Sequence, residues 1–458
     1  MSRATRDDRT APGPAIGDGF TLLAAGDLIS SRPLSPRLAH DAAFGEVARL
    51  LGEASLAVGN METSILDMRT FGGHPRTIDD WCMAALPAVA SDLADLGLRL
   101  VSRANNHCGD WGIEGMRETG RHLDDAGIVH AGAGETLAHA RAPRYVETEH
   151  GRVGLVSAYA AQRWDNDAAL DQFGEAPPRP GVSALRIALT ATTPKPVVDG
   201  LRDLYRRVYP GSPDPGDGEL TVFDTTFVEG APGAATAVRW APDPGDVAEV
   251  LRSVRLGAQH SDLLVVSLHV HEEEGAAGRP PAFLVDLAHA AIDAGAGAVF
   301  GHGSHVLGPV EIYHGRPICY GLGNFIWSDI QECVPGALHA AARARFGDAL
   351  GDPAMVTDAD VNRAFNGSEF ADSRYFESVL VELTCAGGDP VVRLHPIDLR
   401  YGTPLTESGV PRFADESTAR AILERLDAMS RPFGTTVELR ERVGHAVLSR
   451  GRRALPPR

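Results

Sequence analysis

Four histidines directly follow two apolar runs in the middle of the chain. The runs are residues 263–268 and 298–300, and the histidines after them are His269, His271, His302 and His305. Runs of this length are typical of buried parallel strands, whose carboxyl ends meet at one edge of a sheet. Neutral imidazole is a common ligand for Zn, Mn, Fe or Ni. A single histidine after a strand is more often structural, but two such pairs favour one shared metal site.

Three more apolar runs end in carboxylate, amide or imidazole groups. Asp27 follows residues 20–25, Asn60 and Glu62 follow 54–58, and Asn105, Asn106 and His107 follow Leu98–Ser102. Oxygen ligands with an imidazole beside them suit a divalent cation next to a general acid or base. Each group alone is more often a turn or a helix cap, so the prediction depends on their number. The Asn-Asn-His run at 105–107 is the sharpest local motif.

The composition limits the class of protein. A chain of 458 residues suits one large domain with insertions, or two domains. Its formal net charge of -18 argues against nucleic acid as a partner, because nucleic-acid-binding proteins usually show a basic footprint. Five cysteines without CxxC spacing indicate a reducing compartment. Because the sequence shows neither a signal peptide nor a long apolar run, we expect a cytoplasmic protein without membrane contact.

The hydrophobic periodicity predicts the elements that position these groups. Helices are expected at 44–51, within 82–100, at 113–126, 137–141, 197–208, 246–258, 281–294, 416–429 and 436–448. Further strands are expected at 144–148 and 153–158, as a hairpin, and at 378–384 and 391–397. The helix at 281–294 joins the two histidine-bearing strands, which predicts a βαβ unit.

The same pattern predicts the domain organisation. Residues 1–18 are expected to be a disordered tail, 19–402 one domain, and 403–458 a helical extension. The domain is interrupted by insertions at 160–245 and 330–372. The first insertion is rich in Pro, Gly and Asp, and we expect it near the mouth of the pocket, because long segments of this kind are usually functional or mobile.

The ordered set GD, NxE, ANNH, SLH, GHxxH and GLGNF resembles the CapA family of poly-γ-glutamate synthesis proteins, which is related to calcineurin-like metallophosphoesterases. The best-matched stretches are residues 104–134 and 308–327. The resemblance implies an α/β sandwich of two packed mixed sheets flanked by helices, and a divalent metal ion such as Mn, Zn, Fe, Mg or Ca. Its metal positions fall on Asp27, Glu62, Asn106, His269 and the segment with His302 and His305, and its acid/base position falls on His107.

Two departures from the family pattern bear on the chemistry. The family's GHHPH is GHGSH here, so that Gly303 stands where the family has a histidine, and we expect fewer than two tightly held ions. The family's Trp-Gly after the strand-end histidine is Val270-His271, which adds an imidazole. Fewer ligands and an extra base favour proton transfer over phosphate-ester hydrolysis, which uses a two-metal clamp.

The chain is also similar to a cytosolic branch of this family in peptide natural-product pathways, the lasso-peptide epimerases. That resemblance implies inversion of the α-carbon of a precursor peptide's C-terminal residue, with the precursor and a leader-peptide-binding protein as partners. His107 and His271 are the candidate proton-transfer pair, and which face each serves stays open. The predicted substrate contacts are Asn60, Asn105 and Glu273. The alternatives are a metal-dependent hydrolase, either phosphoesterase or amidase, and a capsule-assembly protein of poly-γ-glutamate biosynthesis.

Overall fold

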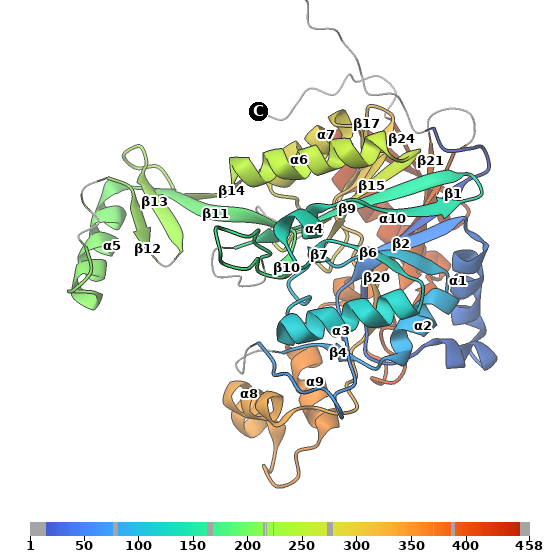
Figure 1. Cartoon of the computed structure of the whole chain (residues 1–458), viewed down its shortest axis with the longest axis horizontal. Coiled ribbons are helices and arrows are strands. Elements are labelled where there is room, and N and C mark those ends of the chain that lie inside the picture. The colour runs from blue at the N-terminus through green and yellow to red at the C-terminus, as the bar shows by residue number, and fades with distance from the viewer. Residues whose placement is uncertain are drawn as a thin grey trace, which may run out of the picture.

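The computed structural model describes residues 15–448 except 77–80, 163–167, 214–215, 217, 223, 273–277, 370 and 386–389. Two large sheets lie face to face, with helices on their outer sides (Figure 1). This arrangement confirms the predicted α/β sandwich of two mixed sheets.

The first sheet has ten strands in the order β23-β24-β21-β20-β1-β2-β5-β6, with β19 beside β1 and β22 beside β21. Their bounds are β1 (Thr21–Ser30), β2 (Leu56–Met61), β5 (Leu98–Ser102), β6 (Val129–Ala131), β19 (Asn324–Ser328), β20 (Glu377–Thr384), β21 (Val391–Asp398), β22 (Arg412–Phe413), β23 (Thr435–Arg440) and β24 (Val443–Leu448). Strands β1, β2, β5, β6 and β19 run parallel, so their carboxyl ends share one edge.

The second sheet also has ten strands, in the order β12-β13-β11-β9-β15-β16-β18-β17, with β14 beside β11 and β8 beside β9. Their bounds are β8 (Arg144–Thr148), β9 (Gly151–Ala161), β11 (Ala184–Thr193), β12 (Leu220–Val222), β13 (Thr225–Glu229), β14 (Ala237–Pro242), β15 (Leu263–His269), β16 (Ala298–His302), β17 (Val310–Tyr313) and β18 (Arg316–Cys319). Strands β9, β15 and β16 are parallel neighbours. The β8–β9 hairpin and the β15–α7–β16 unit, in which α7 is Ala282–Asp293, confirm the sequence predictions.

The α-helices are α1 (Ala42–Glu53), α2 (Ala88–Asp95), α3 (Gly112–Asp125), α4 (Leu137–Arg141), α5 (Lys195–Val208), α6 (Pro244–Gln259), α7 (Ala282–Asp293), α8 (Gly336–Phe346), α9 (Asp358–Glu369) and α10 (Glu416–Ser430). Short 3-10 turns lie at Ser35–Ala39, Gly347–Leu350, Ser373–Phe376 and Arg431–Phe433. Two small two-stranded pairs are β3 (Ser64–Ile65) with β4 (Ala84–Ala85), and β7 (Ala133–Gly134) with β10 (Gly181–Val182). None of the described helices is long and apolar enough to cross a membrane.

Alternation along the strands explains why the sheets pack on both faces. In β1, Leu22 points into the core between the sheets, whereas Leu23 points into the outer core that α1 and α2 cover. In β15, Val265 faces the same inner core, and Val266 packs against the helices α6 and α7. Strands that are apolar on both faces are typical of parallel sheets. The polar residues that follow these strands are thereby fixed at the edge of a rigid sandwich.

Strand β1 corrects one prediction, because it does not stop at Gly26-Asp27 but continues to Ser30. The register of β1 against β2 shifts at a bulge between Ala24 and Asp27. Before the bulge β1 pairs with the antiparallel strand β20, and from Asp27 onward it pairs with the parallel strand β19. Gly26 makes this possible, since a Cβ there would lie 1.9 Å from the carbonyl oxygen of Gly323. Asp27 therefore lies inside a strand, and its direction is set by the bulge.

The C-terminal region corrects a second prediction. The helix at 416–429 is confirmed as α10, but the helix expected at 436–448 is the hairpin β23–β24. Its turn contains Glu441 at φ 57°, and β24 pairs with β21, so the hairpin extends the first sheet. The β-branched residues of β23, among them Thr436 and Val437, suit a strand better than a helix.

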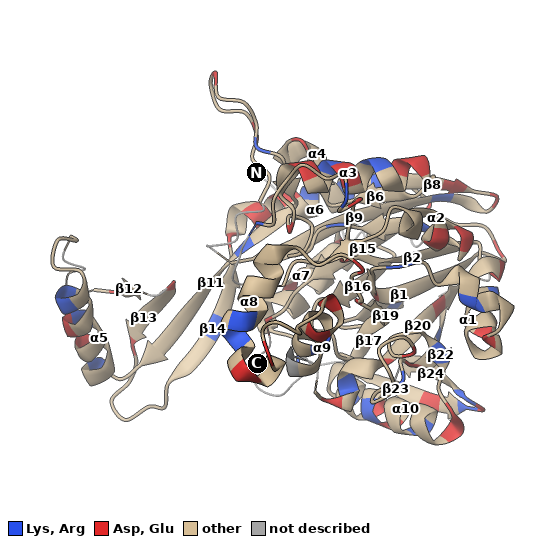
Figure 2. Ribbon diagram, turned by 90° about the horizontal axis from the view of Figure 1, so that it is seen from below, with Lys and Arg blue, Asp and Glu red and all other residues tan. Residues whose placement is uncertain are grey.

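The two predicted insertions have regular structure in their described parts. Strand β11 pairs with β9 at its start and then runs out of the body, where β12, β13, β14 and α5 join it. We call residues 187–242 the arm, which projects from the sandwich in Figures 1 and 2. Residues 330–372 carry α8 and α9, which pack together.

Candidate functional site

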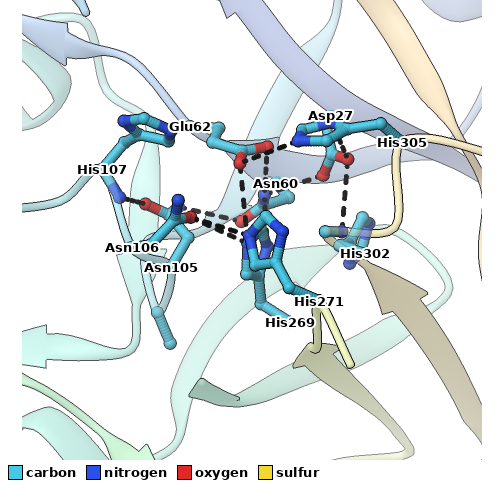
Figure 3. Close-up of polar contacts among 12 residues, drawn as sticks. Asp27, Asn60, Glu62, Asn105, Asn106, His107, His269, His271, His302 and His305 are labelled. Carbon is cyan, nitrogen blue, oxygen red and sulfur yellow. Dashed lines mark hydrogen bonds and ion pairs between the residues drawn. The ribbon is translucent and has the colours of Figure 1, made fainter. Parts of the chain in front are cut away.

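The two sheets bring polar side chains from several strand ends to one place (Figure 3). From the first sheet come Asp27, Asn60, Glu62, Asn105, Asn106 and His107, and from the second come His269, His271, His302 and His305. Of the residues singled out in the sequence, Glu273 alone lies outside the described part of the chain.

Asn60 and Asn105 form a framework of amides beneath the site. Asn105 Nδ2 donates to Asn60 Oδ1 (3.1 Å) and to the carbonyl of Met61 (2.8 Å), and its Oδ1 accepts from the amide of His107 (3.2 Å). Asn60 Nδ2 in turn donates to Asp27 Oδ1 (2.9 Å). Both asparagines are 0% exposed. They act as positioning residues here, and a substrate contact would require them to move.

Three ligand-type atoms form a small triangle at the centre of the site. His269 Nε2 lies 2.9 Å from His271 Nε2 and 3.0 Å from Asn106 Oδ1, and the last two atoms are 3.1 Å apart. Atoms with this spacing can all lie about 2.1 Å from one point, which is the length of a metal–nitrogen bond. Imidazole and amide groups of this kind suit a divalent cation.

Glu62 supplies a buried oxygen with no hydrogen bond. Its Oε1 has no hydrogen-bond partner among the described residues, although it lies 3.5 Å from His269 Nε2 and 3.9 Å from His305 Nε2. Two sets of side chains place ligand atoms within 4.8 Å of one another: Asp27, Glu62 and His269, and Glu62, His271 and His305. A buried carboxylate oxygen costs free energy unless a proton or a cation satisfies it. The residues present therefore fit a divalent cation.

The two central carboxyl groups have opposite pKa shifts. Burial, and then the negative charge of Asp27, raise the pKa of Glu62 well above its ordinary value. Burial also acts to raise the pKa of Asp27, but the hydrogen bond from His305 and the nearby His302 outweigh it and lower that pKa. A cation at this place would favour the ionised form of Glu62.

His107 belongs to a dyad that sequence reasoning missed. Its Nδ1 lies 2.8 Å from Asp110 Oδ2, which also accepts from the backbone amide of Met83 at 2.8 Å. Burial acts to lower the pKa of His107, but the charge of Asp110 and this hydrogen bond raise it. The signal was present in the sequence as a histidine and an aspartate three residues apart. A carboxylate at Nδ1 orients the ring and leaves Nε2 as the nitrogen that exchanges protons with a substrate.

His271 and His302 differ in their surroundings. Burial, together with the neighbouring His305 and His107, lowers the pKa of His271 to about 3, so this ring is neutral at pH 7. Both ring nitrogens of His302 have partners other than the ligand atoms of the site. Nδ1 lies 3.2 Å from Ser267 Oγ, and Nε2 lies 3.3 Å from the carbonyl oxygen of Ala25. His302 thus stands apart from both sets of ligand atoms.

Comparison with known proteins places this site in a family. Residues 21–329 match the model of the bacterial capsule synthesis protein PGA_cap. The chain belongs to this family. It is 39% identical over 443 residues to the uncharacterized protein y4sH of Sinorhizobium fredii, which covers 94% of this chain and 93% of that protein.

More distant relatives carry functional names. The chain is 28% identical over 267 residues to a probable polyglutamine synthesis accessory protein of Mycobacterium tuberculosis, covering 58% of this chain and 54% of that one. It is 22% identical over 368 residues to the PGA biosynthesis protein CapA of Bacillus subtilis, covering 78% and 76%. The mixed sandwich described above is consistent with the metallophosphoesterase-like fold of the PGA_cap family.

Gly303 gives a physical reason for one departure from the PGA_cap pattern. Its φ is 95°, and a Cβ there would lie 2.9 Å from His269 Nε2 and 3.1 Å from the backbone nitrogen of Val270. A histidine at this position would therefore be strained and would collide with His269. The extra imidazole of His271 approaches the same nitrogen, with its Nε2 2.9 Å from His269 Nε2.

The His107–Asp110 dyad predicts a pH dependence in this PGA_cap member when it is free of cations. The folded-state pKa of His107 is raised above 6.5, so the stability that this contact contributes is present below about pH 6.5 and is lost as the pH rises through the folded-state pKa. We expect Asp110→Asn to lower the titration midpoint of His107, measured by histidine NMR. Asp124→Asn, beside the peripheral His130, is the matched control. Equal midpoints for His107 in the parent chain and Asp110→Asn would contradict the dyad.

Proposed function

We propose that this protein is a metal-dependent peptide epimerase, which inverts the α-carbon of a precursor peptide's C-terminal residue by proton transfer. The observation that carries the proposal is that two imidazoles from different sheets lie in the same site, close enough that His107 contributes to lowering the pKa of His271. His107 follows β5 of the first sheet, and His271 follows β15 of the second. Inversion of a carbon requires one group to remove a proton and a second group to return one to the opposite face.

The surroundings of the two imidazoles suit these roles. His271 is neutral, so that it can accept a proton, whereas Asp110 favours the protonated form of His107. Groups whose environments push their pKa values apart are typical acid/base partners. Since the reaction is reversible, His107 can also remove the proton and His271 return it.

A divalent cation would be held by Asp27, Glu62, Asn106, His269 and His305. When bound, it supplies positive charge that stabilises the enolate formed when the α-proton leaves. Burial of Asp27 and Glu62, which are 0% and 1% exposed, keeps water from weakening these interactions. Asn60 donates a hydrogen bond to Asp27 at the bulge, and Asn105 accepts one from the backbone amide of His107, which follows β5 in the sequence. The two asparagines thereby fix the positions of both residues.

The experiment that tests the proposal is incubation in D₂O with precursor peptides encoded by neighbouring genes. An epimerase adds one deuteron at the α-carbon and leaves the peptide whole, which mass spectrometry and chiral amino-acid analysis detect. Pairing with a leader-peptide-binding protein should increase the rate at low peptide concentration. Intact peptide without deuterium, under conditions in which the chain binds a cation, would contradict the proposal.

A second candidate is a metal-dependent hydrolase of an ester or amide, acting in capsule or poly-γ-glutamate synthesis. One observation favours it: His271 Nε2 lies within 2.9–3.1 Å of His269 Nε2 and Asn106 Oδ1, as a ligand would. If His271 held a cation, His107 would be the one acid/base group left, which suits protonation of a leaving group. The Mycobacterium and Bacillus relatives are named for polyglutamine and PGA synthesis, which is the context in which such a hydrolase would act. The D₂O experiment separates the two, because a hydrolase yields cleaved products.

The arm predicts a specific effect on substrate binding. Strand β11 leaves the body beside Tyr159 of β9, whose ring lies 5.6 Å from that of His269, so the arm begins next to the site. We expect replacement of residues 188–239 by a short linker to raise KM and to leave the sandwich folded, because Ile187 and Trp240, which pack with α6 and α7, are kept, and the removed part has a small core of its own. Circular dichroism and KM check this. Unchanged KM in a folded deletion variant would show that the arm does not bind substrate.

A further inference from the structure

Asn324 contacts the one site histidine that has a left-handed backbone. His305 has φ 55°, and its Nδ1 lies 2.9 Å from Asn324 Oδ1. The same nitrogen is 3.5 Å from Asp27 Oδ2, and the other ring nitrogen, Nε2, is 3.9 Å from Glu62 Oε1. Asn324 is 0% exposed, so no solvent competes for its amide.

The orientation of the Asn324 amide is fixed from its far side. Its Nδ2 donates to the carbonyl of Tyr375 at 2.9 Å. A carbonyl can only accept, so Nδ2 must face Tyr375 and Oδ1 must face His305. Oδ1 can only accept as well, so the proton between Asn324 and His305 belongs to the imidazole Nδ1. The neutral ring of His305 therefore has its lone pair on Nε2, the nitrogen on the Glu62 side.

Three glycines bring Asn324 close enough for this contact. Loops 303–308 and 320–324 are joined by the Leu307–Leu322 bridge and by the hydrogen bond from the amide of Gly308 to the carbonyl of Gly321. A Cβ on Gly321 would lie 2.9 Å from the carbonyl oxygen of Val306, and Gly323 has φ 68°. Larger residues would push the two loops apart. The spacing of the GLGN run is thus explained by the contact between Asn324 and His305.

We infer that Asn324 is a positioning residue, which holds His305 in the tautomer whose Nε2 lone pair faces Glu62 and so strengthens the binding of a divalent cation. The inference rests on the cation that the proposed function requires, but not on the identity of the substrate. Partners of this kind orient a metal-binding histidine, and their loss typically lowers metal affinity about 10–100-fold. The ring of His305 also makes a T-shaped contact with Trp327, at 5.3 Å between centroids, which further restricts its rotation.

The test compares Asn324→Ala, which removes the acceptor, with Asn324→Asp, which keeps an oxygen opposite Nδ1. Full-length chains are stripped of metal and titrated with Mn²⁺ by calorimetry. We expect Asn324→Ala to bind Mn²⁺ about 10–100-fold more weakly, and Asn324→Asp to bind much more tightly than the alanine variant. Nitrogen NMR of the metal-free chain, with His305 assigned from His305→Gln, should show the proton on Nδ1 in the parent and a shift toward Nε2 in Asn324→Ala.

Asn362→Ala is the matched control, because Asn362 is equally buried and donates to two carbonyls, those of Gln331 and Asp358, outside the site. It should lose stability as Asn324→Ala does, but keep the Mn²⁺ affinity of the parent chain. Equal Mn²⁺ affinity in Asn324→Ala and the parent, or a proton on Nε2 of His305 in the parent, would overturn the inference. If Asn324→Ala does not fold, the position of the proton on His305 in the parent chain still tests the inference. If these results hold but no peptide is inverted, the epimerase proposal alone fails.

Discussion

Alanine in place of His107 should slow inversion of the α-carbon by about 10²–10⁴-fold, the usual effect of losing a positioned acid or base. The reason is geometric, since His107 is the imidazole held by Asp110 on the side of the first sheet. Asp110→Asn should cost less, because it keeps a hydrogen-bonding oxygen but removes the charge that favours the imidazolium. Rates from chiral analysis of the recovered residue measure both effects.

The control for this variant is His130→Ala. His130 lies on β6 of the same sheet, and burial, together with Arg103, lowers its pKa to about 3. It belongs to neither set of ligand atoms in the described structure. We expect His130→Ala to keep the parent rate once corrected for the folded fraction. A His107→Ala variant that is folded, binds the cation and inverts the substrate at the parent rate would remove His107 from the mechanism.

Removal of the cation should abolish activity, and a divalent ion should restore it. Glu62 Oε1 is buried and has no hydrogen-bond partner among the described residues, and burial, followed by the charge of Asp27, raises the pKa of Glu62, so a cation bound here would satisfy this carboxylate. A ligand at about 100 times its Kd adds about 2.7 kcal/mol to folding stability. Chelation should therefore lower the melting temperature as well as the rate, and both should recover together on adding Mn²⁺ or Ca²⁺.

The same experiment reports on the number of ions. Gly303 has no side chain that could bind an ion, and a side chain at this position would displace His269. We therefore expect metal analysis to find fewer than two tightly held ions per chain. Full activity in a rigorously metal-free preparation would contradict the cation requirement. Two stoichiometric, tightly bound ions would instead show that His271 acts as a ligand, and would favour the hydrolase.

The positions of the site residues could be predicted because apolar runs in this chain end abruptly in carboxylate, amide and imidazole side chains, which bind cations or exchange protons. The run before His269 and the run before His302 are buried parallel neighbours, which hydrophobic pattern alone indicates. The hydrophobic pattern does not predict which segments far apart in the sequence come into contact. The bulge at Asp27 depends on Gly26 meeting Gly323, and the tautomer of His305 depends on Tyr375.

Local propensity failed where tertiary pairing decided the structure. Residues 436–448 have enough helical spacing to predict a helix, yet β24 pairs with β21 and forms a hairpin there. The irregular composition of 160–245 did not reveal that β11 would continue the second sheet into the arm. Asp110 was missed although it stands three residues after His107, because a loop after a strand was expected to hold ligands and not a dyad.

The most direct test of the acid/base account is the behaviour of His271→Ala in D₂O. If His107 and His271 serve opposite faces of the α-carbon, this variant stops net inversion. His107 alone can still exchange deuterium into one stereoisomer, because a single base removes and returns a proton on its own face. Chiral analysis with mass spectrometry should therefore show deuterium in one stereoisomer and none in the other. Inversion at the parent rate by a folded His271→Ala variant would contradict the account.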